Sequence, residues 1–584
     1  MAASSDPLGG FRDEAAFLLE EALHSLRQDE ARSAVRATLA PAPAGKGDFA
    51  YPCFPLAKTM RKAPSAAAQE IVAALPQSPR LRVVAEGPYV NFTVEPAALA
   101  EATLASVTER ALRYGTLPET GKSVIVEHTS ANPNGPFHVG RARNPIVGDS
   151  LARVLRAAGD RVTTEYYVND VGKQVAILSW GLANLKGDQV PTAERQKPDH
   201  QRVAYYQKAN ELQEKDPKVA SAITESLARF EAGDLDVAAA FRDAAGQVLS
   251  GMRESLARMN VEMDRYSWES EYIQNGSVQP VIEKLKASPL AHQDESGSWF
   301  LDLESYGIAG RSQRWTFMRS NGTSLYTTRD VAYHLDKFSR AQRVVNVLGE
   351  DHKLTMQQLD IALDVVGALQ HPQIVWISFV SLPEGKMSTR RNRVVFIDDL
   401  MDEAVARARE EVEKRRAGEM PPDEMDKIAE LVGIGALRYN IASVQAEKSI
   451  TFRWEDALNF EGDSAPYIQY SHARASSILR KAEAEGIRAA SHPSFSHASE
   501  FALVKAIARL PGVVKQAADD LRIHVVAAYA GELANAFNQF YRDCPVLIAS
   551  DAHTKASRVA LVAATKQTLA NALGLLGIVA PDAM

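Results

Sequence analysis

The sequence predicts an α/β fold whose main domain is built on a Rossmann-like parallel sheet. A β-branched run at residues 123–126 predicts a buried strand, and a loop rich in Asn, Pro and Gly follows it. A helix then begins, with Val147, Leu151, Val154 and Leu155 at helical spacing. The alternation of strand and helix returns over residues 327–380, which favours a parallel sheet.

The elements predict five regions along the chain. Residues 1–112 combine helices at 12–39 and 66–75 with strands at 81–86 and 89–94, which predicts an additional α+β domain. Residues 113–182 form the first half of the Rossmann-like domain. Residues 183–315 are polar and charged without strong strand signals, so we expect a helical insertion. Residues 316–424 form the second half, with helices at 327–338 and 353–368 and strands at 344–348 and 374–380. Residues 425–584 are expected to be all-α.

Composition bounds the classes of function. The chain has 584 residues, 46% of them apolar and 24% charged, and its net charge is −7. A nucleic-acid partner would therefore be held by local basic patches rather than by a basic surface overall. The two cysteines, Cys53 and Cys544, exclude a disulfide scaffold and a cysteine-rich zinc site and fit a reducing cytosol. We expect a cytoplasmic protein with no membrane span and no resident metal.

The stretch His138-Val139-Gly140-Arg141 lies where the first strand hands over to a helix N-terminus. Such a position offers free backbone N–H groups and a positive dipole end to a phosphate. The alternative is a capped helix start with a partly buried histidine. A second motif, Gly385-Lys386-Met387-Ser388-Thr389 and the following arginines, suits a clamp on a polyphosphate, and its alternative is a solvated basic loop.

Taken together, these two motifs resemble the HIGH and KMSK motifs of class I aminoacyl-tRNA synthetases. Residues 349–352, Gly-Glu-Asp-His, follow a strand where that family binds adenosine and ribose. Asp351 is a natural acceptor for ribose hydroxyls, although it is also placed to cap the next helix. The resemblance implies ATP as a substrate together with Mg²⁺. It implies an ATP site made of Pro136, His138, Gly140, Arg141, Gly349, Asp351, His352, Lys386, Met387 and Ser388, with His138, Arg141, Lys386 and Arg390 as catalytic residues.

Over nearly the whole chain, further stretches resemble arginyl-tRNA synthetases. These are residues 126–133, 166–172, 325–334, 465–474 and 533–538, together with 47–50 and 87–92 in the N-terminal region. The resemblance implies that arginine is activated with ATP and then transferred to the 3′-terminal adenosine of its tRNA. It also implies that adenylate formation needs bound tRNA. We expect a monomer.

Recognition of arginine calls for carboxylates, because a guanidinium is planar, always charged and best satisfied by bidentate bonds. Tyr326 and Asp330 are four residues apart on a predicted helix and share a face. The alternative for Asp330 is an ion pair with Arg329 or Lys337. By resemblance, Glu269 is a second carboxylate for the guanidinium, and Glu127 and Asn132 hold the amino-acid head.

The helical C-terminal region resembles an anticodon-binding domain. Bases from a tRNA loop stack on aromatic rings and arginine planes, which makes Tyr470, Arg474 and Tyr541 candidates for RNA contact. The alternative is that such stripes belong to the core, and we assign Phe537 and Phe540 there. The N-terminal domain of this family touches the tRNA elbow, and Asn91 is the candidate there.

Two departures from the family pattern keep alternatives open. Arg141 replaces the last histidine of the first motif, and Thr389 replaces the last lysine of the second. Which of Lys386, Arg390 and Arg391 contacts the phosphates is therefore open. The rival functions are a class I synthetase for another amino acid, a smaller nucleotidyltransferase, and a non-catalytic RNA-binding relative.

Overall fold

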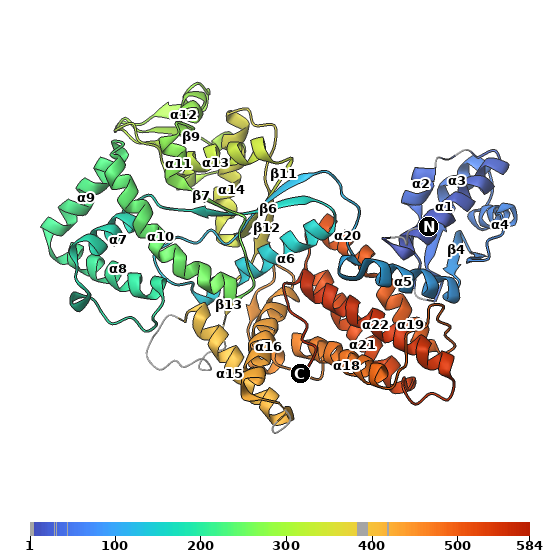
Figure 1. Cartoon of the computed structure of the whole chain (residues 1–584). Coiled ribbons are helices and arrows are strands. Elements are labelled where there is room, and N and C mark those ends of the chain that lie inside the picture. The colour runs from blue at the N-terminus through green and yellow to red at the C-terminus, as the bar shows by residue number, and fades with distance from the viewer. Residues whose placement is uncertain (1–4, 29, 31, 44, 382–394, 417–419) are drawn as a thin grey trace.

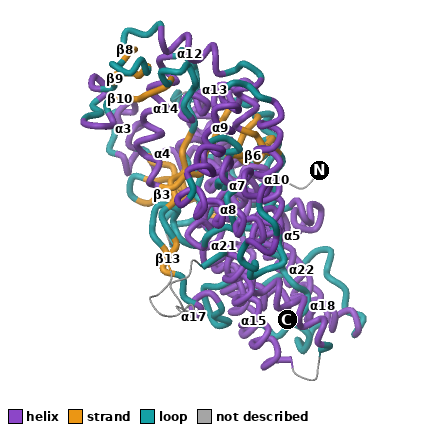
Figure 2. Tube along the Cα trace, turned by 90° about the vertical axis from the view of Figure 1, so that its left-hand side faces the viewer, coloured by secondary structure: helices purple, strands orange, loops and turns teal. Residues whose placement is uncertain are grey.

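A computed structural model describes residues 5–28, 30, 32–43, 45–381, 395–416 and 420–584. The molecule is elongated: Figure 2 shows the small sheet β8–β10 at one end and helices α15, α18 and α22 at the other. The N-terminal module lies at the right in Figure 1, beside the C-terminal helices rather than beside the central sheet. An ion pair of 2.8 Å between Lys505 and Asp48 joins the two.

The N-terminal module is a four-stranded antiparallel sheet of order β1-β2-β4-β3, covered by helices. Phe92 on the inner strand lies opposite Phe49 and Val83 on its two neighbours, and its side chain is fully buried. The strands predicted at 81–86 and 89–94 are confirmed. The elements are α1 (Pro7–Ser25), α2 (Arg32–Thr38), β1 (Ala40–Pro41), β2 (Phe49–Pro52), α3 (Phe54–Met60), α4 (Pro64–Ala74), β3 (Leu81–Glu86), β4 (Tyr89–Val94) and α5 (Pro96–Arg110).

The central sheet has five parallel strands in the order β12-β11-β5-β6-β7. The chain runs from β5 outward to β7 on one side and then from β11 to β12 on the other. The strand order therefore reverses between β5 and β11, and ligands of open α/β sheets bind at the carboxyl ends of the strands at such a reversal. The elements are β5 (Ser123–Glu127), α6 (Arg143–Ala157), β6 (Arg161–Val168), β7 (Arg265–Trp268), α13 (Tyr326–Arg340), β11 (Arg343–Gly349), α14 (Lys353–Val365) and β12 (Gln373–Ile377).

The insertion is not purely helical: besides the helices that the sequence predicts, it contains short strands. β7 pairs with β6 at the edge of the central sheet, and a hairpin of β8 and β9 joins β10 in a separate small sheet. These strands are only three to five residues long, and pairing with neighbours distant in sequence decides their conformation. The other elements are α7 (Lys173–Asn184), α8 (Pro198–Lys215), α9 (Pro217–Glu231), α10 (Leu235–Arg258), α11 (Glu269–Gln274), α12 (Val278–Lys286), β8 (Ala291–Gln293), β9 (Trp299–Asp302) and β10 (Arg314–Met318).

The C-terminal part is a helical bundle, shown in orange and red in Figure 1. Leu533, Phe537 and Phe540 of α21 are fully buried in it, which confirms the assignment of both phenylalanines to the core. No helix in the described ranges is both long and apolar enough to cross a membrane. The prediction of an all-α region is wrong at one point, because the short strand β14 (Ile450–Thr451) pairs with β13 (Val380–Ser381). The remaining elements of the chain are α15 (Ile397–Arg416), α16 (Pro422–Ala442), α17 (Trp454–Ala457), α18 (Ala465–Ala484), α19 (Ala498–Ala508), α20 (Leu510–Asp520), α21 (His524–Asp543) and α22 (Ala552–Leu575).

Candidate active site

A cleft of about 340 Å³ lies at the carboxyl edge of the central sheet, where the strand order reverses. Every strand of the sheet contributes its end or the residue that follows it, in the order Glu127, Asn169, Glu269, Gly349 and Ser378. The cleft thus joins residues from both halves of the catalytic region. Of the residues predicted from sequence, it is lined by Glu127, Asn132, Gly140, Arg141, Glu269, Tyr326, Asp330, Gly349, Asp351 and His352.

The first motif forms a short 3₁₀ turn, η2 (Val139–Arg141), directly before α6. His138 is exposed and caps this turn: its Nδ1 accepts the N–H of Gly140 at 3.0 Å. Partial burial, with the nearby charge of Arg141, lowers the pKa of His138. Because Nδ1 is the acceptor, the neutral ring carries its proton on Nε2, where it can donate to a phosphate oxygen. The capping interpretation and the phosphate interpretation are therefore compatible.

The chain after the second motif is hydrogen-bonded to the first motif. Val139 donates its N–H to the carbonyl of Val395, and Ile397 donates to the carbonyl of Phe137, both at 2.9 Å. These bonds flank His138, which pairs with Phe396 as an isolated antiparallel bridge. Lys386, Met387, Ser388 and Arg390 lie outside the described residues, so their predicted roles stay predictions.

Arg143, at the start of α6, is a buried residue that sequence reasoning missed. Its guanidinium donates to the carbonyls of Ser378 at 3.2 Å, Gln445 at 2.6 Å and Lys448, and it has a longer contact with Val444. Burial lowers its pKa to about 10. Arg143 thereby ties the helix after the first motif to the end of β12 and to the loop after α16.

Asp330 lies at the cleft beside a buried polar network. Nδ1 of His334 contacts its carboxylate at 3.1 Å, so neither Arg329 nor Lys337, the alternatives expected from sequence, is its ion-pair partner. Burial raises the pKa of Asp330, but the charge and hydrogen bond of His334 outweigh that effect and leave the pKa below its ordinary value. The carboxylate is therefore ionised and available to a cationic ligand.

Lys337 forms its ion pair with Glu127 and not with Asp330. Its buried ammonium lies 2.6 Å from the carboxylate of Glu127 and 3.1 Å from the side-chain oxygen of Asn346. The hydroxyl of Ser130 donates to the other Glu127 oxygen at 3.1 Å.

Thr129 and Ser130 have positive φ values of 72° and 37°, an unfavourable conformation for residues with a side chain. Strained backbone therefore lines the cleft directly after β5.

Glu269 is buried and forms an ion pair with Arg329. Burial raises its pKa to about 6, although Arg329 opposes the shift. Beside it, the buried hydroxyl of Tyr167 has no hydrogen-bond partner among the described residues, and its ring stacks on Tyr333 at 4.4 Å. A buried hydroxyl without a partner at the wall of a cleft is available to hydrogen-bond a ligand. Tyr167 belongs to the stretch 166–172, which is one of the stretches that resemble the family.

The remaining predicted cleft residues are more exposed. Tyr326 is 59% exposed at the mouth of the cleft. Asn132, Asp351 and His352 are also exposed. The N-cap of α14 is His352, with no side-chain capping bond, so the alternative role of Asp351 as a helix cap is not realised.

The predicted tRNA contacts divide into two cases. The guanidinium of Arg474 lies between two rings, 4.8 Å from the centroid of Tyr470 and 5.1 Å from that of Tyr541. This trio reaches the surface, since Tyr541 is 42% exposed. Asn91, by contrast, is only 7% exposed and donates to Glu86, so its burial does not support direct contact with RNA.

The strand order, the motif at the reversal and the helical C-terminal bundle together define a class I aminoacyl-tRNA synthetase. Residues 104–454 match the family model "tRNA synthetases class I (R), catalytic domain", and residues 468–584 match "DALR anticodon binding domain". Residues 14–94 match "Arginyl tRNA synthetase N terminal domain". The chain belongs to the arginyl-tRNA synthetase family, as the resemblance of its motifs predicted.

Individual relatives agree over most of the chain. An arginine–tRNA ligase of Methanocella arvoryzae is 47% identical over 532 residues, covering 91% of this chain and 92% of that protein. One from Methanocorpusculum labreanum is 43% identical over 534 residues, covering 91% and 93%. The solved structure of Thermus thermophilus arginyl-tRNA synthetase matches with a TM-score of 0.79 at 29% identity, covering 98% of this chain and all of that one.

Proposed function

We propose that this chain is an arginine–tRNA ligase that activates L-arginine with ATP and transfers it to the 3′-terminal adenosine of its tRNA. The observation that carries this proposal is the single cleft at the strand reversal. It joins Gly140 and Arg141 of the turn that follows His138, the exposed Asp351 and the carboxylates of Glu269 and Asp330. Phosphate, ribose and guanidinium thus each find a complementary group in one space.

In the first step, the arginine carboxylate attacks the α-phosphate of ATP, and pyrophosphate leaves as arginyl-adenylate forms. The substrates supply the nucleophiles, so the protein contributes position and charge rather than a nucleophilic side chain. His138 donates from Nε2 to a phosphate oxygen, and Arg141 adds a fixed positive charge. The N-terminus of α6 adds its backbone dipole. Lys386 and Arg390 are proposed to neutralise the leaving pyrophosphate.

The side chain of arginine is proposed to lie between Asp330 and Glu269. Asp330 is ionised at the cleft, and Glu269 supplies a second carboxylate that Arg329 only partly satisfies. Two carboxylates suit a planar guanidinium with five N–H donors. Tyr326 walls the entrance, and we add the unpaired hydroxyl of Tyr167 to this pocket. Asn132 and Glu127 are proposed to orient the amino-acid head.

Mg²⁺ is proposed to accompany ATP. Among the carboxylates of the cleft, Glu127 and Glu269 are already paired with Lys337 and Arg329, and Asp330 faces His334. We therefore propose that the triphosphate itself holds the ion. When bound, the ion offsets charge on the phosphates as pyrophosphate departs.

In the second step, the terminal ribose hydroxyl of tRNA attacks the adenylate carbonyl and AMP leaves. Tyr470, Arg474 and Tyr541 offer stacking surfaces to bases of the anticodon loop, since two rings and a guanidinium plane are grouped at the surface. We also propose that the protein acts as a cytoplasmic monomer.

An aminoacylation assay with each radiolabelled amino acid and total tRNA tests the proposal. We expect charging with arginine alone. Charging with another amino acid would assign a different specificity, and absence of charging with every amino acid would point to a non-catalytic RNA-binding protein. Transfer of the nucleotide from ATP to a small acceptor in the absence of tRNA would point to a nucleotidyltransferase.

A further inference from the structure

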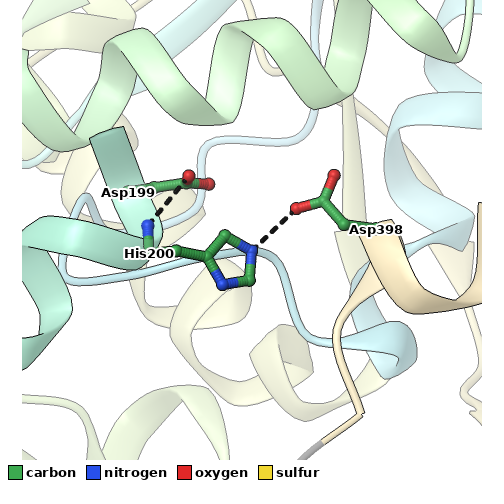
Figure 3. Close-up of side chains that lie close together, drawn as sticks. All are labelled: Asp199, His200 and Asp398. Carbon is green, nitrogen blue, oxygen red and sulfur yellow. Dashed lines mark hydrogen bonds and ion pairs between the residues drawn. The ribbon is translucent and has the colours of Figure 1, made fainter. Parts of the chain in front are cut away.

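Three buried residues from two distant segments meet where the helical insertion packs against the start of α15. Asp199 and His200 lie at the start of α8, and Asp398 is the second residue of α15 (Figure 3). Oδ2 of Asp398 lies 3.0 Å from Nε2 of His200. Its Oδ1 accepts the hydroxyl of Ser255, on α10, at 2.9 Å. Two aspartates and a histidine within ligand distance of one another are a conceivable cation site.

A lysine already occupies the cation position. The ammonium of Lys197 lies 2.8 Å from Asp398, 3.1 Å from Asp199 and within hydrogen-bond distance of Ser255. A metal ion would have to displace this ammonium or share a buried space with it, which Coulomb repulsion disfavours. We therefore describe the cluster as an ion-pair hub, made of Lys197, Asp199, His200, Ser255 and Asp398.

A short segment of chain connects the hub to the first motif. Asp398 directly follows the segment 395–397, whose backbone bonds lie on both sides of His138. The ring of His200 also packs edge-on against Phe396, with centroids 5.1 Å apart. The side chain of Asp399 accepts the N–H of Phe396 at 3.1 Å, which fixes the same segment again.

We propose that Asp398 is a positioning residue for adenylate formation, acting through segment 395–397 on His138. The inserted helices α8 and α10 hold its carboxylate, and the carboxylate holds the segment that pairs with the motif. Residues of the insertion thereby set the geometry at the phosphate site without contacting a substrate. This inference rests on the proposed function, since it assigns His138 to the ATP phosphates.

The primary test is pyrophosphate exchange by Asp398→Asn, with arginine, ATP and tRNA present. Misplacing a catalytic group by about 1 Å can cost about a hundredfold in rate, so we expect kcat to fall at least tenfold. The KM for arginine should stay within about twofold, because the guanidinium pocket is formed by other elements. A kcat within twofold of the wild type would overturn the proposal.

Glu500→Gln is the matched control. Glu500 is also a buried acid in an ion pair, 2.7 Å from Arg558, but it lies in the C-terminal bundle. We expect this variant to lose thermal stability while its kcat is unchanged. If kcat falls in proportion to the loss of melting temperature in both variants, the role of Asp398 is only structural and the proposal fails.

Hydrogen–deuterium exchange supplies a readout that does not depend on activity. The amides of Val139 and Ile397, which bridge the motif and segment 395–397, should exchange faster in Asp398→Asn but not in Glu500→Gln. Ser255→Ala removes one hydrogen bond of the hub and provides a milder variant if Asp398→Asn fails to fold. Unchanged exchange at both amides in the folded variants would overturn the proposal.

Two further outcomes are separable. Absence of arginine-dependent exchange in the wild type would refute the proposed function, while the deuterium experiment would still test the hub. A rise in the wild-type melting temperature with Zn²⁺ that is lost in Asp398→Asn would show a metal site and overturn the lysine-centred hub.

Discussion

The backbone N–H of Val139 donates to the carbonyl of Val395 at 2.9 Å, although the two residues belong to different halves of the catalytic region. Val139 is part of the turn that we propose binds phosphate, and Val395 belongs to the chain that follows the second motif. This bond holds the chain that follows the second motif against the first motif. It is the direct structural basis for proposing that both motifs act on one nucleotide.

His138→Ala is expected to slow adenylate formation without unfolding the protein. The side chain is exposed, and among the described residues its hydrogen bond is the capping bond from the N–H of Gly140. Loss of one donor to a charged transition state costs about a hundredfold to a thousandfold in kcat. Pyrophosphate exchange and thermal melting measure the two effects, and unchanged exchange would remove His138 from the phosphate site.

Asp330→Asn is expected to raise the KM for arginine by at least about tenfold, because it removes one charge from the guanidinium pocket. The KM for ATP should stay near that of the wild type. Asp351→Asn is the reciprocal control, since it should weaken ATP and spare arginine. Steady-state kinetics with each substrate varied in turn tests both, and an unchanged KM for arginine would exclude Asp330 from the pocket.

The raised pKa of Glu269 predicts that kcat/KM for arginine depends on pH. Burial raises its pKa to about 6, and only its ionised form attracts a guanidinium. The kcat/KM for arginine should therefore fall about tenfold between about pH 7 and pH 5. Glu269→Gln should bind arginine weakly and lose this step, whereas a step of equal size in that variant would assign it to another group.

The same residue affects stability in the opposite direction. Its pKa in the folded state lies above the ordinary value of 4.5, so the folded state binds the proton more tightly than the unfolded state. The contribution of Glu269 to the free energy of unfolding therefore falls as the pH rises from 4.5 to about 6. Comparing urea unfolding of the wild type and Glu269→Gln across this range measures the effect.

Arg143→Met is expected to destabilise the catalytic domain by about 3 kcal/mol or more, because it leaves buried carbonyls without a donor. Lys515→Ala is a suitable control, since the exposed pair of Lys515 with Asp519 should contribute under about 1 kcal/mol. Urea unfolding followed by circular dichroism compares the two variants. Equal unfolding midpoints would show that the Arg143 contacts contribute little to stability.

Arg474→Ala is expected to raise the KM for tRNA about tenfold or more, because the guanidinium that separates Tyr470 and Tyr541 would be lost. The KM for arginine should not change. Phe537→Leu, a conservative change in the buried core of the same bundle, controls for general damage. An unchanged KM for tRNA would show that Tyr470, Arg474 and Tyr541 stabilise the bundle and do not bind tRNA.

Much of the fold follows from local patterns. The β-branched strands at 123–127 and 343–349 and the helix that presents Asp330 are visible in the sequence, because their burial pattern is regular. β7 is not visible in this way. It is a four-residue edge strand with little apolar pattern, and pairing with β6 creates it.

The candidate site, like the fold, was only partly predictable from the sequence. Motifs identify His138 and Asp330, because their spacing along the chain carries the signal. The partners of two other carboxylates in the cleft are set by the tertiary fold: Lys337 pairs with Glu127, and Arg329 pairs with Glu269. Domain boundaries stay predictions. The match to the catalytic-domain model continues to residue 454, past the boundary expected at residue 424.

The most direct test of the central claim is the crystal structure of the protein with a non-hydrolysable arginyl-adenylate analogue. We predict its adenosine beside residues 349–352, its phosphate mimic at the turn that begins with His138, and its guanidinium within hydrogen-bond distance of Asp330. An analogue bound outside this cleft, or one whose guanidinium points away from Asp330 and Glu269, would contradict the account.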